Sequence, residues 1–524
     1  MKKERPNAKR PAAAAAQAPR KVRLSGAPDR GENARAFVFL LLGNLVAYLP
    51  LCVFHGKSYS FDSPAILVKG DWVHYGGFID SYRYIGALVY KIYSLTGHNP
   101  IENSTPDIVL FILLAAVGTA AFVYALRKRL KIEGVLPLAA IELAVLLSVE
   151  NAWFSAILTF PESIFLAGVG LVCCFCALIV FMRRRSVWTW LLSAVLLLCA
   201  VATYQQYLSV FIIFAIAIVS AELTAESGSR PKNVFLAYFK TAVFLAATCA
   251  VYFAVGKAVA KTFDIAGSTR TALTLEAIME NIRYFATHQR SFLWGRGTFK
   301  TEILTAAFLS LGGLWFVCLL VFTLKKKEFF KAGLIAASYA AAYVSGYLLG
   351  LISVSHENRA LFALFSIFFL FTLGIVAKSP KKLLSAVPAC ILAVVFAANV
   401  FVIIRTGNNH RLQNAADIDC AERISEAIDA YEKTSGVTVT KLAYCRDAAQ
   451  EPEHGDSLFY YDYALEPLLT LKSSRYTPGV EKIYTFSDVP EQIYGQYFAG
   501  KDWHSLDLEE QLIIIDDTAY LCVY

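Results

Sequence analysis

Long apolar segments alternate with short polar loops along most of the chain. The first covers residues 36–54, and further segments lie near residues 106–126, 134–150, 162–182, 187–204, 206–223, 235–256, 302–323, 330–352, 359–377 and 384–404. A helix of roughly 20 apolar residues is long enough to cross a lipid bilayer. The pattern therefore predicts a polytopic α-helical membrane protein with about 11 transmembrane helices.

Clusters of Lys and Arg occupy alternate loops between the apolar segments. They lie at residues 127–131, 183–185, 230–232, 325–327 and 378–382. Loops rich in Lys and Arg face the cytoplasm in most membrane proteins. This rule places the N-terminus in the cytoplasm, and about 11 crossings then place the C-terminus outside.

The N-terminal residues 1–35 contain ten Lys and Arg against three acidic residues. Such a composition predicts a disordered basic cytoplasmic tail. The apolar segment that follows lacks a small-residue cleavage site, so we expect an uncleaved transmembrane helix and not a signal peptide. Residues 36–405 are then the transmembrane bundle.

The composition agrees with a membrane location and argues against several other classes. Hydrophobic residues make up 57% of the 524 residues and charged residues 17%, whereas a soluble domain carries about a quarter charged residues. The net charge of +8 is concentrated in the tail and the basic loops, which indicates topology and not nucleic-acid binding. The sequence contains no nucleotide-binding motif and no metal-ligand cluster, so we expect no cofactor and no metal.

The composition changes beyond Arg405. Residues 406–524 contain 9 Lys and Arg against 21 Asp and Glu, a net charge of −12. An amphipathic helical pattern covers residues 416–431, and short β-like runs cover residues 437–444 and 512–515. The segment is therefore predicted to be a small extracytoplasmic α/β domain.

Candidate chemistry gathers in the two long outside loops, residues 55–105 and 257–301. The first contains Asp62, Asp71, Asp80 and Arg83 among aromatic residues, and the helical pattern at residues 82–93 predicts an amphipathic helix at the membrane surface. A carboxylate can act as general base on a sugar hydroxyl, and an arginine can bind a phosphate leaving group. The alternative is that these are ordinary solvated loop charges. The second loop is suited to closing over a lipid phosphate.

Carboxylates near the membrane form a second group of candidates. Glu142 lies within an apolar segment, whereas Glu150 and Glu162 lie at outer ends, where a sugar would bind. Charged residues inside a membrane are costly and often functional, although Glu142 could instead only specify helix packing. In the C-terminal segment, residues 460–463 (Tyr-Tyr-Asp-Tyr) are either a platform for carbohydrate or the core of a small domain.

Three motifs resemble those of the bacterial O-antigen glucosyltransferases of the type II Gtr family, which belong to the GT-C class. Asp62 is followed some twenty residues later by Tyr82-Arg83-Tyr84-Ile85, where the family has Gly at the position of Tyr82. Residues 203–209 (Thr-Tyr-Gln-Gln-Tyr-Leu-Ser) resemble the family's Tyr-Gln element at a helix turn. Residues 357–361 (Glu-Asn-Arg-Ala-Leu) resemble its Arg at the start of a late helix. The similarity covers residues 36–405.

The resemblance implies a GT-C-like, inverting, metal-independent glycosyltransferase in the bacterial cytoplasmic (inner) membrane. Its donor would be a polyprenyl-phosphate sugar, with glucose expected, and its acceptor a cell-envelope polysaccharide or glycopolymer on the outer face. Asp62 would be the catalytic base, with Asp71 and Asp80 as alternatives. The other implied site residues are two donor or phosphate ligands, Arg83 and Arg359, and three residues lining the cavity, Tyr204, Gln205 and Gln206.

Two other functions fit the same sequence pattern. A lipid-linked sugar or polysaccharide flippase would also place arginines in a cavity, but it needs no carboxylate beside an acceptor and seldom has a long acidic outside domain. An envelope polysaccharide polymerase also carries arginines in its outside loops. The pattern of acids in the first outside loop favours the transferase over the flippase and does not exclude the polymerase.

Overall fold

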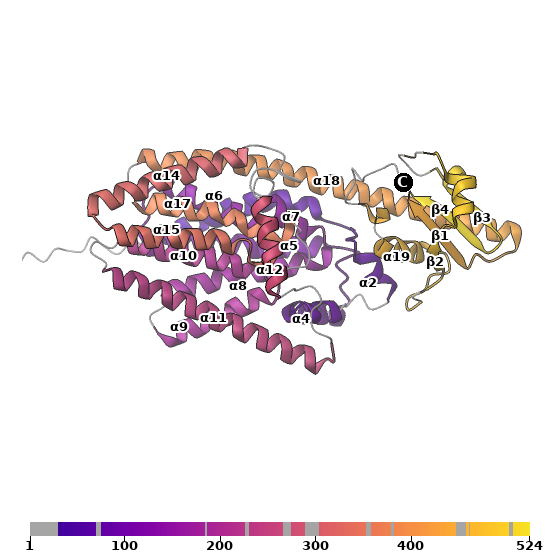
Figure 1. Cartoon of the computed structure of the whole chain (residues 1–524), viewed down its shortest axis with the longest axis horizontal. Helices are drawn as coiled ribbons and strands as arrows, with labels where there is room; N and C mark the ends of the chain where they lie inside the picture. Colours follow the sequence, from indigo (N-terminus) through magenta and orange to yellow (C-terminus); the bar gives the residue numbers. More distant parts are fainter. Residues whose placement is uncertain are drawn as a thin grey trace, which may run out of the picture.

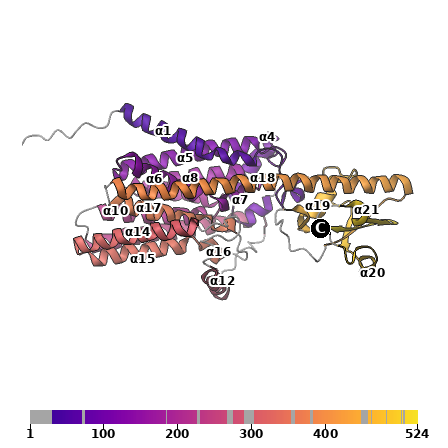
Figure 2. The same ribbon diagram turned by 90° about the horizontal axis from the view of Figure 1, so that it is seen from above.

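The protein is elongated, with a bundle of long helices at one end and a small α/β domain at the other (Figure 1). This computed structural model describes residues 30–69, 75–183, 186–225, 230–265, 274–288, 303–352, 358–378, 382–446, 457–460, 462–480, 482–501, 503 and 507–523. One helix, α18 (Lys382–Ser435), begins in the bundle and ends in the C-terminal domain, as Figure 2 shows. The two parts are therefore joined by a continuous helix.

The bundle consists of apolar helices, most of which follow the predicted segments. They are α1 (Arg30–Tyr48) with η1 (Leu49–Phe54), α5 (Thr105–Leu130), α6 (Val135–Val149), α7 (Ala152–Leu158), α8 (Ile164–Arg183), α9 (Val187–Val201), α10 (Tyr207–Ala225), α11 (Pro231–Thr262), α14 (Ile303–Lys326), α15 (Phe329–Ser345), α17 (Ser366–Lys378) with η3 (Asn358–Phe365), and α18. Every predicted apolar segment is thus helical over most of its length.

The class of membrane protein is confirmed, whereas the number of crossings stays a prediction. Within the described residues, eight helices are long and apolar enough to cross a membrane. Helices α6 and α7, bent by 46° at residues 150–151, form a ninth candidate. Helices α9 and α15 are apolar but shorter than 18 residues. All these helices coincide with predicted segments except α7, which lies between the segments 134–150 and 162–182.

Aromatic side chains fill the centre of the bundle. The rings of Phe214 in α10 and Phe369 in α17 stack with centroids 4.0 Å apart, and those of Phe122 in α5 and Phe175 in α8 stack at 5.1 Å. Offset stacking is a preferred geometry of buried aromatic pairs. Where α8 passes α5, a Cβ on Gly168 would lie 3.1 Å from the backbone of Phe111, so the glycine permits the close approach.

Short helices lie in the connections between the long helices of the bundle. They are α2 (Ser63–Val68), η2 (Pro161–Ser163), α3 (Tyr75–Asp80), α4 (Tyr84–Thr96), α12 (Leu275–Thr287) and α16 (Leu348–Leu351). Helix α4 is the predicted amphipathic helix and begins two residues later than expected. It buries Val89, Tyr90 and Tyr93, and exposes Leu88 and Ile92.

The C-terminal domain contains a four-stranded sheet in the order β2-β1-β4-β3. Strand β1 (Lys441–Arg446) pairs in parallel with β2 (Thr485–Asp488) and β4 (Thr518–Val523), and β3 (Leu512–Ile515) pairs antiparallel with β4. The C-terminal end of α18, together with α19 (Asp462–Lys472), packs against it, and η4 (Leu458–Tyr460), α20 (Glu491–Ile493), η5 (Tyr494–Phe498) and α21 (Leu508–Gln511) complete the domain.

The sequence-predicted elements of this domain are present with shifted limits. Strand β3 has the predicted bounds, whereas β1 begins at Lys441, four residues after the predicted start. The predicted helix at residues 416–431 is the last part of α18. The predicted domain boundary between residues 405 and 406 therefore lies inside a continuous helix.

Candidate functional site

A cavity of about 760 Å³ lies in the bundle, where the bundle meets the C-terminal domain. Its walls come from α2, the α3–α4 turn, η2, the turn between α9 and α10, α11, α16 and the start of η3. Small-molecule sites usually have volumes of about 300 to 1,000 Å³. The cavity is therefore large enough for a sugar and its leaving group.

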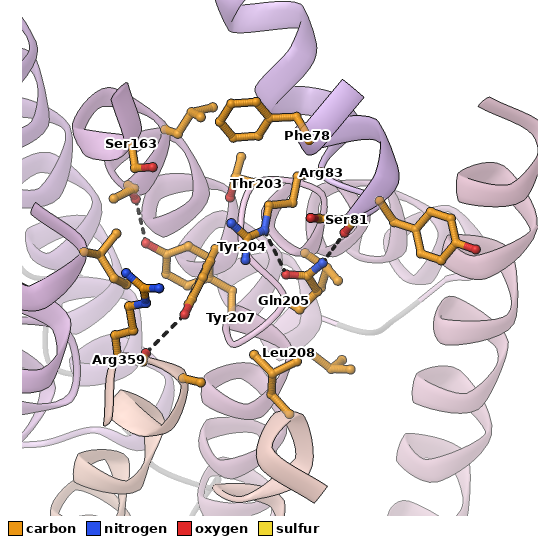
Figure 3. Close-up of a pocket in the computed structure, with 18 of the residues that line it drawn as sticks. Phe78, Ser81, Arg83, Ser163, Thr203, Tyr204, Gln205, Tyr207, Leu208 and Arg359 are labelled. Carbon is orange, nitrogen blue, oxygen red and sulfur yellow. Dashed lines mark hydrogen bonds between the residues drawn. The ribbon is translucent and has the colours of Figure 1, made fainter. Parts of the chain in front are cut away.

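Arg83 occupies one wall of the cavity, immediately before α4. Its Nε donates a hydrogen bond to Oε1 of Gln205 at 3.2 Å, and its guanidinium lies 4.8 Å from the ring centroid of Tyr204. A cation over an aromatic face is held by the quadrupole of the ring. These two contacts orient the guanidinium toward the cavity (Figure 3).

Gln205 is held in turn by groups from two other elements. It lies in the tight turn between α9 and α10, and its side-chain amide donates to the backbone carbonyl of Ser81 and to the Tyr252 hydroxyl of α11. The Tyr252 hydroxyl donates to the backbone carbonyl of Tyr82 at 3.2 Å. The turn of Tyr82, which has a φ of +56°, is thereby fixed beside Arg83.

Arg359 lies on the other side of Tyr204 (Figure 3). The Tyr204 hydroxyl donates to the backbone carbonyl of Arg359 at 3.2 Å. The Arg359 guanidinium lies 4.3 Å from the ring centroid of Phe160. Both arginines line the same cavity, although they are 276 residues apart in the numbering of the chain. Together they make one region of the cavity positive, which suits a phosphate.

Two carboxylates line the same cavity. Asp62 precedes α2 and is exposed, whereas Glu162 in η2 is only 4% exposed. The Glu162 carboxylate accepts hydrogen bonds from the hydroxyls of Ser60 at 2.8 Å and Ser63 at 3.5 Å, and Asp62 is near enough to repel it electrostatically. Asp62 is therefore the carboxylate that solvent and substrate can reach.

The other candidates lie elsewhere. Gln206 is fully buried, and its amide donates to the backbone carbonyl of Gly346 at 3.1 Å. Glu150 is fully buried at the bend between α6 and α7, and Asp80 is half-buried at the end of α3. The described cavity lining includes none of these three. Asp71 lies outside the described residues, as does much of the second outside loop.

Several cavity residues escaped the sequence analysis. Tyr252 lies in an apolar segment, where nothing marks it as polar lining. The Phe160 ring contacts the Arg359 guanidinium, but the two residues lie in distant segments, so the sequence gives no sign of this contact. Ser60 and Ser63, which bind Glu162 from outside the described cavity lining, flank Asp62 at a spacing that could have marked a side-chain hydrogen-bonding turn. Within the described part of the chain, no group of three His, Cys, Asp or Glu side chains could hold a metal ion.

The fold and the cavity define a polytopic membrane protein with a substrate-sized site at one end of its helical bundle, where two arginines and two carboxylates meet. The chain belongs to the glucosyl transferase GtrII family, whose model matches residues 51–376. The matched region extends from η1 to α17 and contains all the cavity residues described above. A search among curated proteins found no match.

The family match confirms the resemblance inferred from the motifs. It identifies the chain as a membrane glycosyltransferase of the glucosyl transferase type, in a family associated with O-antigen modification.

Proposed function

We propose that this protein transfers a glucosyl group from a polyprenyl-phosphate donor to a cell-envelope polysaccharide, on the outer face of the bacterial cytoplasmic membrane. The observation that carries the proposal is that the reachable carboxylate of Asp62 and the guanidinium groups of Arg83 and Arg359 line one cavity. The proposal includes 11 crossings, the apolar segments of the sequence analysis, with a cytoplasmic N-terminus and an extracytoplasmic C-terminus.

The proposed donor binds with its phosphate near Arg83 and Arg359. Guanidinium groups match the oxygens of a phosphate and stay charged at any working pH. As the bond between the sugar C1 and the phosphate oxygen breaks, its electron pair moves to the phosphate, where negative charge grows. Positive groups already in place stabilise that charge in the transition state without a metal ion.

The proposed base is Asp62. Its carboxylate removes the proton from an acceptor hydroxyl while the hydroxyl oxygen forms the new bond to C1 on the face opposite the leaving phosphate. This single displacement inverts the anomeric centre, as in other GT-C enzymes. Asp62 is favoured over Asp80 because Asp62 lines the cavity and Asp80 does not. Glu162 is buried and bound by the hydroxyls of Ser60 and Ser63, so it stays in place beside Asp62.

The test is a membrane assay of glucose transfer from synthetic polyprenyl-phosphate glucose to envelope polysaccharide. We expect Asp62→Asn to lower the rate by roughly 10² to 10⁴-fold, the usual contribution of a general base. Arg83→Ala should lower it by about 10²-fold or more, since a fixed transition-state partner of the phosphate is lost. Asp80→Asn is the matched control, because it removes an acid of the same loop outside the cavity.

Three outcomes would count against the proposal. Full activity of Asp62→Asn at normal expression would refute the assignment of the base. An equal loss in Asp80→Asn would show that the loop, and not the cavity carboxylate, matters. No transfer by the wild type with any of several donor sugars would favour the flippase, which binds the same lipid-linked sugar without making a bond.

A further inference from the structure

The C-terminal domain contributes to the cavity although it lies beyond the family match. Tyr463, in the first turn of α19, lines the cavity and is 54% exposed. More than half of its surface is therefore accessible to solvent. The domain therefore forms part of the site itself.

The same domain also forms hydrogen bonds with the loop that carries Asp62. The backbone N–H of Tyr59 donates to Oδ1 of Asn414 at 3.0 Å, and Nδ2 of Asn414 donates back to the Tyr59 carbonyl at 2.8 Å. The Tyr476 hydroxyl donates to the Leu67 carbonyl at 2.8 Å. One contact precedes Asp62 in the sequence and the other follows it, so the carboxylate lies between two attachments to the C-terminal domain.

Apolar packing reinforces these hydrogen bonds. Tyr59 is 1% exposed and Ile66 4%, and both belong to the hydrophobic core of the C-terminal domain, with Leu465 and Leu468 of α19. Helix α2 is thus shared between the first outside loop and this domain. Since α19 packs on α2, the position of Tyr463 is linked to that of Asp62.

The lipid-linked donor and the polymer acceptor should enter the cavity from different sides. A lipid-linked donor is anchored in the membrane, so its phosphate comes from the side of the bundle, where the arginines lie. A sugar polymer comes from the water, where the C-terminal domain lies. A pyranose ring presents a face of C–H groups, and the negative face of an aromatic ring attracts such groups.

We propose that the C-terminal domain forms the acceptor side of this cavity, where an uncharged saccharide unit stacks on Tyr463 and presents a hydroxyl to Asp62. The inference rests on the proposed function. An uncharged acceptor fits because residues 406–524, which lie on the acceptor side, have a net charge of −12. An anionic glycopolymer would be repelled by this charge.

The experiment measures binding separately from transfer. Saturation-transfer NMR with the full-length protein in nanodiscs would give the affinity for a neutral oligosaccharide fragment of the O-polysaccharide, for the wild type, Tyr463→Leu and Tyr463→Phe. We expect Tyr463→Leu to weaken binding by about threefold to tenfold, the usual worth of an aromatic contact. Tyr463→Phe should bind like the wild type, because the ring remains.

Tyr497→Leu is the matched control, because Tyr497 is a half-buried tyrosine of the same domain that does not line the described cavity. In transfer assays, Tyr463→Leu should raise the KM for the acceptor and leave the KM for the donor unchanged. Absence of binding by the wild type, unchanged binding by Tyr463→Leu, or an equal loss in Tyr497→Leu would overturn the acceptor site. Binding that is intact in a wild type without transfer activity would overturn the proposed function alone.

Discussion

The adjacent residues Gln205 and Gln206 are expected to have opposite roles, which gives a sharp test of the site. The Gln205 side chain lines the cavity and holds Arg83. The Gln206 side chain points away and is fully buried against the backbone of Gly346. Replacing each with Ala should therefore weaken substrate binding in the first variant only.

The magnitudes follow from the contacts. Gln205→Ala removes the hydrogen bond to the Arg83 guanidinium, and bonds to charged groups contribute about 1.5 to 3 kcal/mol. Arg83 keeps its contact with the Tyr204 ring, so we expect a loss of about 1 to 2 kcal/mol in donor binding, or roughly fivefold to thirtyfold. Gln206→Ala leaves the buried Gly346 carbonyl without its donor and should lower the free energy of unfolding by about 1 to 3 kcal/mol.

The assay combines donor titrations of glucosyl transfer with thermal unfolding of the purified protein in detergent. Both variants should lower the Tm, because Gln205 also donates hydrogen bonds to Ser81 and Tyr252, but only Gln205→Ala should raise the KM for the donor. A second variant of the first position, Gln205→Glu, retains an acceptor for Arg83 and should recover part of the donor affinity. Similar effects of the two alanine variants on both quantities would refute the distinction.

Three more predictions concern the ring at the site, the bend in the bundle and the C-terminal domain. Tyr204→Phe keeps the aromatic face and should lower donor affinity at most about threefold, whereas Tyr204→Leu should lower it about tenfold, measured as donor KM. Asn399→Leu removes both hydrogen bonds that bridge residues 150 and 152, at 2.7 and 2.9 Å, and should cost about 2 to 4 kcal/mol of stability in thermal unfolding, unlike the exposed Asn409→Leu. Hydrogen bonds from Lys441 and two threonines lower the pKa of Asp517 below its ordinary value of 3.8. The ionised Asp517 therefore stabilises the fold above pH 3.8, and this stabilisation is lost as the pH falls through the lowered pKa. Asp517→Asn should therefore flatten the acid limb of unfolding followed by circular dichroism.

The helices of the bundle were predictable because the bilayer demands long apolar segments. The points at which a helix bends or continues past its apolar segment were not predictable. Residues 407–409, Gly-Asn-Asn, look like the end of a helix, yet α18 continues through them. A Cβ on Gly407 would lie 2.3 Å from the Val53 side chain, so this glycine allows α18 to pass η1 and does not end it. The bend at residues 150–151 depends in the same way on Asn399, which is distant in the sequence.

The candidate site could be predicted residue by residue only where a motif marked it. The motifs pointed to Asp62, Arg83, Tyr204, Gln205 and Arg359, and the structure brings all five to one cavity. What stays a prediction is their chemical role. The sequence does not distinguish a glutamine that faces a cavity from its buried neighbour, because a tight turn lacks the regular periodicity that assigns faces in helices.

The meeting of bundle and C-terminal domain bears on how the two substrates reach the site. Helix α18 runs without interruption through both parts, and its 54 residues span about 80 Å at 1.5 Å per residue. A continuous helix resists hinge motion, and the shared packing of α2 adds a second connection close to Asp62. The continuous helix and the shared packing therefore hold the C-terminal domain and the Asp62 loop in a fixed relation. Under the proposed function, weakening the hydrogen bonds between Asn414 and Tyr59 should displace Asp62 without changing how the donor phosphate meets Arg83.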